Sequence, residues 1–272
     1  MPSESIIRLS VFVCVLACMM AWEALAPRRV QAIARAKRWP SNLAIAAIDT
    51  LIVRLVFPTA AVGLAIIAEQ RSWGLLNAVA LPTWLAAVVA FILLDLAIYL
   101  QHVLFHAVPS LWRLHRMHHA DLEFDFTTGI RFHPLEIVLS LVIKLGVVAA
   151  LGAPAAAVTM FEIILNASSM FNHGNARLPL GADRLLRWIV VTPDMHRVHH
   201  SILPNETNSN FGFNLPWWDR LCGTYRAQPA DGHDGMIIGI EQFRDAGELR
   251  IDRMLAQPFR GEAGGYAINR RP

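Results

Sequence analysis

Charged side chains are scarce in this chain. Of its 272 residues only 17% are Asp, Glu, Lys or Arg, whereas 55% are hydrophobic. This balance excludes an ordinary soluble domain, in which about a quarter of the residues are charged. The formal net charge of +3 does not indicate nucleic-acid binding, because the only dense basic cluster lies between two apolar segments. The composition therefore predicts an integral membrane protein.

Cysteine is scarce as well. The three cysteines, Cys14, Cys18 and Cys222, are odd in number, and two of them lie inside the first apolar run. This pattern excludes a disulfide framework and fits an enzyme whose thiols stay reduced. The sequence also lacks a Gly-rich dinucleotide turn and a cysteine set for an iron–sulfur cluster. A redox enzyme with this sequence would need a separate reductase, ferredoxin or cytochrome-type electron donor.

Long apolar segments predict the membrane-spanning helices. A helix needs about 20 mainly apolar residues to cross a hydrocarbon core of about 30 Å. Five segments approach this length, at residues 6–25, 43–68, 78–100, 135–151 and 155–170. The last two are short and meet at a turn, residues 152–154, which predicts a hairpin. The first segment could instead be a signal peptide, but Glu23 and Pro27 flank its possible cleavage site, and we interpret it as a transmembrane helix.

Basic residues predict which helix ends face the cytoplasm. The loop after the second segment contains only Arg71. Between the first two segments lie five basic residues: Arg28, Arg29, Arg35, Lys37 and Arg38. By the positive-inside rule, residues 27–40 are cytoplasmic. The alternation of spans then places every histidine cluster on the same side, with residues 171–272 as a cap. We therefore expect an all-α protein of the bacterial inner membrane, with four to five transmembrane helices and a cytoplasmic helical cap.

Histidine is concentrated in one part of the chain. Ten of the 11 histidines lie between residues 102 and 200, and the word HRMHH at 115–119 returns as HRVHH at 196–200. Positions i, i+3 and i+4 share one face of a helix, so each word presents several imidazoles in one direction. Thr192, Pro193 and Asp194 form a helix-start signal directly before the second word. His233 stands apart, and we expect it to be an ordinary surface or hydrogen-bonded residue.

So many histidines in one pocket indicate metal binding. Burying ten ionisable rings would be costly unless bound metal ions replaced their protons. One first-row ion takes four to six ligands, so ten imidazoles favour two ions. Neutral imidazole suits iron, zinc, copper and nickel, and the ligand type alone leaves the metal open. A structural zinc site would normally use four ligands, often with cysteine, so this excess favours catalysis.

Seven sequence words in a fixed order carry a family resemblance. They are HVLFH, HRMHH, RFHPLE, FNHGN, TPDMHRVHH, TNSNFG and WWDRLCGT, between Asp95 and Thr224. The series resembles the fatty acid hydroxylase and sterol desaturase superfamily. The resemblance implies a membrane-embedded, non-haem di-iron oxygenase that uses O2 and two electrons to attack an unactivated C–H bond of a lipid. Val103, where the family often has arginine, and Phe211, in its NYG element, are departures that leave the subfamily and substrate open.

Carried over position by position, the resemblance implies ten metal ligands. They are His102, His106, His115, His118, His119, His133, His173, His196, His199 and His200. Iron is favoured over zinc because the reaction needs redox chemistry, which zinc lacks.

Several polar residues could orient these ligands, because a ligating imidazole usually donates its other N–H to an oxygen. Asp95 and Tyr99 share a helical stripe with His102 and His106. An aspartate in an apolar run is costly and so indicates function, although a packing partner such as a hydroxyl or Arg54 is an alternative. Further candidates, each with a capping or turn role as the alternative, are Glu136, Asn172, Asn208, Asn210 and Asp219.

The leading hypothesis is an O2-dependent di-iron hydroxylase of a membrane lipid, which could be a fatty acyl, sterol or isoprenoid chain. A desaturase on the same site is the alternative, since both reactions begin with the same hydrogen abstraction. A membrane metal transporter is a rival from another class. We expect N-terminal transmembrane helices at 1–80, the catalytic domain at 81–224 and a cytoplasmic C-terminal segment at 225–272.

Overall fold

The computed structural model describes residues 4–57 and 60–268. Within these residues the chain is helical, and its extended pairings are two isolated β-bridges, Pro27–Ala176 and Ser201–Ile238. The long helices are α1 (Glu4–Leu25), α2 (Arg35–Val56), α3 (Ala60–Arg71), α5 (Thr83–Ala107), α6 (Pro109–His119), α7 (Pro134–Leu151) and α8 (Ala155–Asn172). The short helices are α4 (Leu75–Ala78), α9 (Leu180–Leu186), α10 (Pro193–His199), α11 (Pro204–Thr207), α12 (Trp217–Leu221), α13 (Gly232–Gly235) and α14 (Ile251–Ala256), with 3₁₀ turns η1 (Thr128–Ile130), η2 (Ala246–Leu249) and η3 (Gln257–Phe259).

Four helical stretches in the described part of the chain are long and apolar enough to cross a membrane. They are Glu4–Leu25, Thr83–Ala107, Pro134–Leu151 and the stretch Arg35–Ala78, which combines α2, α3 and α4 and runs over residues 58–59, outside the described part. The predicted all-α membrane architecture is therefore confirmed. The segment expected at 155–170 is helical as α8, but Glu162, Asn166 and its serines make it too polar to join these four.

Two expected boundaries differ from the structure. The third span begins at Thr83 and continues to Ala107, so His102 and His106 belong to the span itself. The helix of the second span begins at Arg35, well before its apolar part, because Arg38 and Asn42 are buried against the loop that follows α6. Both extensions carry polar residues that a hydropathy pattern excludes and that tertiary contacts satisfy.

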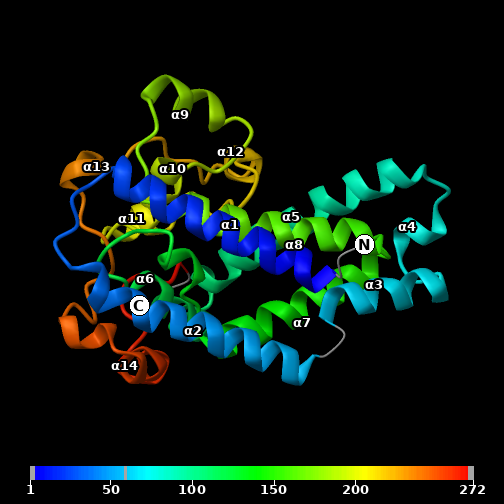
Figure 1. Cartoon of the computed structure of the whole chain (residues 1–272), viewed down its shortest axis with the longest axis horizontal. Helices are drawn as coiled ribbons and strands as arrows, with labels where there is room; N and C mark the ends of the chain where they lie inside the picture. The colour runs from blue at the N-terminus through cyan, green and yellow to red at the C-terminus, as the bar shows by residue number, and fades with distance from the viewer. Residues whose placement is uncertain (1–3, 58–59, 269–272) are drawn as a thin grey trace.

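Helices α1, α2, α3, α5, α7 and α8 lie along the long axis of the molecule. Helix α4 lies at one end, and helix α6 and the short helices α9 to α14 gather at the opposite end (Figure 1). Helices α1, α5 and α8 run towards that end, whereas α2 and α7 run away from it. Five helix termini therefore meet there, and the word-bearing helices α6 and α10 lie among them. The bundle positions the histidines where its helices meet the cap of short helices.

The bundle core joins α3, α5, α7 and α8. It contains many alanines, which let helix backbones approach closely, and one edge-to-face aromatic pair, Phe91–Phe161. At the hairpin between α7 and α8, Gly152 has a φ of 63°, which a residue with a side chain rarely adopts. This left-handed position ends α7 and returns the chain along the bundle as α8.

Candidate metal centre

Nine of the ten predicted ligand histidines converge in two adjacent groups. Helix α5 provides His102 and His106, and α6 provides the three histidines of the HRMHH motif at 115–119. The remaining members are His173 at the end of α8 and the three histidines of the word on α10. In each group, one ring nitrogen from every histidine lies within 4.8 Å of the corresponding nitrogens of the others, and all nine side chains are buried.

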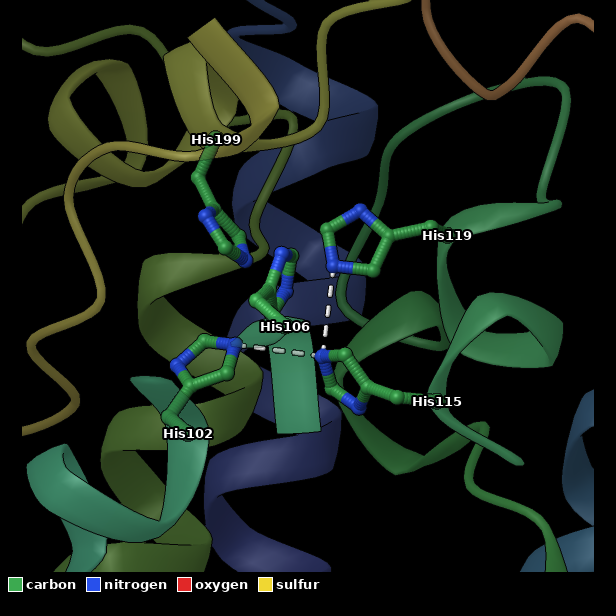
Figure 2. A group of neighbouring side chains, drawn as sticks. All are labelled: His102, His106, His115, His119 and His199. Carbon is green, nitrogen blue, oxygen red and sulfur yellow. Dashed lines mark hydrogen bonds between the residues drawn. The ribbon is translucent and has the colours of Figure 1, made fainter. Parts of the chain in front are cut away.

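The five-histidine group consists of His102, His106, His115, His119 and His199. Figure 2 shows their rings pointing towards one another from α5, α6 and α10. The Nε2 atom of His115 lies 3.1 Å from that of His102 and 3.2 Å from that of His119. Two nitrogens bound to one ion at about 2.1 Å, at right angles, would be about 3.0 Å apart. The spacing therefore fits ligands of a shared ion.

The four-histidine group consists of His118, His173, His196 and His200. The Nε2 atom of His173 lies 3.1 Å from that of His118 and 3.2 Å from that of His200. The two groups adjoin, since the rings of His119 and His200 stack with centroids 4.4 Å apart. Neighbours in sequence, such as His118 and His119, belong to different groups because successive helical residues point about 100° apart.

Oxygen acceptors fix the outer nitrogen of six rings. In each, Nδ1 lies within hydrogen-bond distance of an oxygen, which places the proton on Nδ1 and leaves the lone pair of Nε2 directed into the group. The pairs are His102–Phe211 O (2.8 Å), His106–Asn208 Oδ1 (3.1 Å), His115–Glu136 Oε1 (2.6 Å), His118–Arg131 O (3.2 Å), His173–Ser169 O (2.8 Å) and His199–Ser209 O (2.7 Å). This arrangement is the one that metal-ligating histidines adopt.

Several inner nitrogens are buried without a partner. Nε2 of His106, Nε2 of His199 and both ring nitrogens of His196 make no hydrogen bond in the described structure. An unsatisfied buried polar atom costs about 1–3 kcal/mol. Burial also lowers the pKa of His115 and His173 to about 3, so the rings are neutral near pH 7. Neutral rings with free inward lone pairs fit a divalent metal ion in each group.

His133 is not brought to either group. It is the N-cap of α7, where its Nδ1 accepts a hydrogen bond from the backbone N–H of Leu135. Its Nε2 lies 3.3 Å from the carbonyl oxygen of Leu255. Because Pro134 opens α7, the residue before it takes the capping position and its ring points away from the groups. We therefore restrict the ligand set to the other nine histidines.

Two of the predicted orienting residues contact a ligand histidine directly, namely Glu136 with His115 and Asn208 with His106. The others act on loops. Asp95 accepts hydrogen bonds from Asn214, Leu215 and Trp218, and Tyr99 is hydrogen-bonded to Thr224. Asp219 accepts hydrogen bonds from the backbone N–H groups of Phe211 and Gly212. Asn172 donates to the carbonyl oxygen of Phe213, and Asn210 donates to the carbonyl oxygens of Met195 and Arg226.

Sequence reasoning missed a buried ionic network that fixes the loop after α6. The Arg38 guanidinium donates to both oxygens of Asp121, at 2.7 Å each, and also to Asp125. All three side chains are fully buried, and this arginine holds the pKa of Asp121 well below its usual range. In the sequence, Arg38 counts among the basic residues of the topology signal, and nothing marks it as a structural residue.

Glu23 at the end of α1 fixes the same loop from another side. Its Oε1 accepts hydrogen bonds from the backbone N–H groups of Phe126 and Asn175, each at 2.8 Å. Asn175 directly follows the stretch that contains His173, so α1 helps to hold the four-histidine group in place. His233, expected to be an ordinary residue, is buried outside both groups, with Nε2 3.7 Å from Asp194.

An open cavity of about 620 Å³ adjoins the five-histidine group. Asn208 and Phe211 line it and separate it from the rings, since Asn208 bonds His106 and Phe211 packs 5.1 Å from the same ring. Val103 of α5 lines another side. The cavity therefore lies on the outer side of Asn208 and Phe211, which stand between it and the candidate metal ligands.

Comparisons with known proteins agree with this site. Residues 87–224, half of the chain, match the fatty acid hydroxylase family profile. This matched range contains every histidine of the two groups. The chain is 29% identical to the ornithine lipid hydroxylase OlsE of Rhizobium tropici over 191 residues, 70% of this chain and 55% of that protein. It is 27% identical to cholesterol 25-hydroxylase of Rattus norvegicus over 59% of this chain and 52% of that protein.

A third relative is alkylglycerol monooxygenase of Homo sapiens, at 27% identity over 59% of this chain and 34% of that protein. In each of these pairs the match covers less than two thirds of the relative. No solved structure gives a significant match to this chain.

Proposed function

Because the chain belongs to the fatty acid hydroxylase family, we propose that it is an O2-dependent di-iron enzyme that hydroxylates an unactivated C–H bond of a membrane lipid. The observation that carries the proposal is the pair of adjacent, fully enclosed, all-histidine groups at the end of a membrane bundle. The relatives are lipid hydroxylases and monooxygenases by name, which supports an oxidoreductase.

The donor set supports two redox-active ions. Five and four imidazoles are the ligand numbers that two first-row ions accept, and the groups contain neither thiolates nor carboxylates. Iron fits these ligands and, when bound, supplies the oxidising power that C–H cleavage requires. Zinc would fit the ligands but could not supply that power.

The chain's own residues hold this centre rigid and dry. Glu136 orients the ring of His115 and raises its basicity, and the carbonyl oxygens of Phe211, Ser169 and Ser209 do the same for their partners. Phe211 packs against the rings of His102 and His199, which excludes water from that side. Rigid ligands and a dry interior keep a strong oxidant from reacting with solvent.

The reaction balances as R–H + O2 + 2 electrons + 2 protons giving R–OH + H2O. The electrons come from a separate reductase, ferredoxin or cytochrome-type donor, because the chain encodes no electron-transfer motif. A desaturase would use the same components and remove a second hydrogen from the substrate. The activities in the names of the relatives, two hydroxylases and a monooxygenase, favour hydroxylation, and we propose a lipid that enters from the bilayer.

We also propose a division of the chain for this function. Residues 1–80 provide N-terminal membrane helices, 81–224 the catalytic domain, and 225–272 a C-terminal segment on the cytoplasmic side of a bacterial inner membrane. One of its links to the catalytic part is Arg116 of α6, which donates to the carbonyls of Gln257, Arg260 and Glu262. The C-terminal segment therefore packs on α6, the helix that provides candidate ligands to both histidine groups.

Lipid mass spectrometry of expressing cells tests the proposal. Cells with the wild-type chain should contain a lipid that has gained one oxygen atom, and cells with His199→Ala should not. The matched control is His233→Gln, a buried histidine outside both groups, which should keep the product. A lipid that has lost two hydrogens would establish the desaturase instead. An unchanged product in His199→Ala would refute both activities.

A further inference from the structure

Helix α12 reaches the middle of a membrane span. Asp95 is the middle residue of α5, about 18 Å along the axis from Ala107 at 1.5 Å per residue. Its Oδ2 accepts a hydrogen bond of 2.8 Å from the indole of Trp218, a residue of α12. Figure 1 likewise shows α12 further along the bundle than α10. If α5 spans the bilayer, α12 lies at membrane depth beside it.

The outer surface of α12 and the nearby α9 is apolar and exposed. Leu185 is 68% exposed, Trp188 59% and Ile189 58%, and Leu221 at the end of α12 is 76% exposed. Leu185 lies in the last turn of α9, and Trp188 and Ile189 lie in the hydrogen-bonded turn that follows it. Exposed side chains of this size in one place mark a surface that contacts another apolar phase. We call this surface the α9–α12 patch, and it consists of Leu185, Trp188, Ile189, Trp217 and Leu221.

Contacts between the two helices make the patch a single surface. The Trp217 indole donates to the carbonyl oxygen of Trp188 at 2.8 Å. The Arg220 guanidinium lies 4.0 Å from the Trp188 ring and donates to the carbonyl of Arg187. Arg184 of α9 is exposed, and Arg220 of α12 is partly exposed. Tryptophan together with flanking arginine is the composition found at the boundary between acyl chains and headgroups.

We propose that the α9–α12 patch is inserted in the lipid leaflet on the histidine side of the membrane. Three observations favour lipid as its occupant. The patch is continuous with a membrane span through the Asp95–Trp218 hydrogen bond, it is apolar, and its exposed basic residues match anionic headgroups. The proposal depends on the bundle spanning a membrane, and it does not depend on the proposed reaction.

A single loop connects the α9–α12 patch to the five-histidine group. Asp219 of α12 accepts hydrogen bonds from the backbone N–H groups of Phe211 and Gly212, both at 2.8 Å. The carbonyl oxygen of Phe211 in turn accepts from His102. A lipid in that leaflet would therefore border the same loop that orients a candidate ligand and lines the 620 Å³ cavity.

Spin labels read by collision with apolar O2 and a water-soluble nickel chelate test the insertion. The full chain carries Cys14→Ser and Cys18→Ser and is reconstituted in bilayer discs. The native Cys222, exposed at the end of α12, is the first probe and needs no substitution in the patch. In a Cys222→Ser background, Leu185→Cys probes α9. The control is Asp231→Cys, an exposed position directly before α13, which lies at the far end of the cap.

Insertion predicts that O2 relaxes the labels at 222 and 185 at least several-fold more than the nickel chelate does. The label at 231 should show the reverse order. Labels at 222 and 185 that behave like the label at 231 would overturn the proposal. Shielding of both labels from both reagents would also overturn it and would indicate a second copy of the chain or a protein partner. These readouts need neither metal nor activity, so they fail or succeed separately from the proposed function.

Discussion

Glu136 accepts a hydrogen bond from Nδ1 of His115 at 2.6 Å, and it is the only carboxylate that the described structure places against a ligand histidine. Its other oxygen, Oε2, has no hydrogen-bond partner. The carboxylate fixes the ring and makes its inner nitrogen a better donor to a metal. It therefore links the first turn of α7 to the five-histidine group.

We expect Glu136→Ala to weaken iron binding by about 10–100-fold, the usual cost of losing such a partner. Glu136→Gln keeps an oxygen acceptor and should retain most of the affinity. Competition with a chelator, followed by metal analysis of each variant, measures the difference. Equal affinities in the alanine variant and the wild type would show that His115 does not depend on this carboxylate.

Gly129 allows η1 to approach α8 closely. A Cβ at this position would lie 2.2 Å from the carbonyl oxygen of Ser169, which is the acceptor for His173. Gly129→Ala should therefore displace that carbonyl and lower the iron content of the four-histidine group. Gly146→Ala is the control, since its added Cβ would meet nothing within 4 Å. Similar iron content in the two variants would contradict this role.

The Arg38–Asp121 pair should stabilise the fold strongly. Removing one partner of a fully buried pair typically costs about 3–5 kcal/mol, and Arg38 would keep only Asp125 as its carboxylate partner. We expect Asp121→Ala to lower the free energy of unfolding by about that amount, measured by denaturant titration in detergent. Arg38→Lys retains the charge but loses the two-pronged geometry, so its loss should be smaller. An unchanged free energy of unfolding in Asp121→Ala would show that the loop is held by other contacts.

Iron-free protein should lose stability as the pH falls. Histidine in the unfolded chain has a pKa near 6.5. Burial lowers the pKa of His115 and His173 to about 3. Between these values the unfolded state binds protons that the folded state does not, so stability decreases from about pH 6.5 downwards. Burial raises the pKa of Asp219 to about 6, which acts in the opposite sense, but the buried histidines of the two groups are nine and outweigh it.

Thermal unfolding of the iron-free protein at pH 7.5 and pH 5.5 checks this sign. The midpoint should be lower at pH 5.5, and bound metal should reduce the difference because it keeps the rings deprotonated. A midpoint that is unchanged or higher at pH 5.5 would show that the rings are not buried in neutral form.

The convergence of the histidines was predictable because helical spacing places i, i+3 and i+4 on one face. The division into two groups was not, because it depends on how α5, α6 and α10 are rotated against each other. His133 shows the same limit. Its place before Pro134 favours an N-cap, whereas the family resemblance implied a ligand.

The oxygen atoms that accept hydrogen bonds from the ligand histidines show why much of the site cannot be predicted from the sequence. Four of the six histidine acceptors are backbone carbonyls, those of Phe211, Arg131, Ser169 and Ser209, and any residue has a carbonyl. Asp95 indicated a buried partner, because an aspartate inside an apolar span needs one, but the structure gives it loop partners and no ligand histidine. Its partner Trp218 lies 123 residues later, so only the tertiary structure reveals it.

Metal analysis of purified, active protein tests the central claim most directly. We expect about two iron ions per chain, with His199→Ala reducing the occupancy of the five-histidine group and His196→Ala that of the four-histidine group. His133→Ala, outside both groups, should keep the full iron content. Active protein without any transition metal, or with its iron unchanged in both group variants, would contradict a di-iron centre built from these histidines.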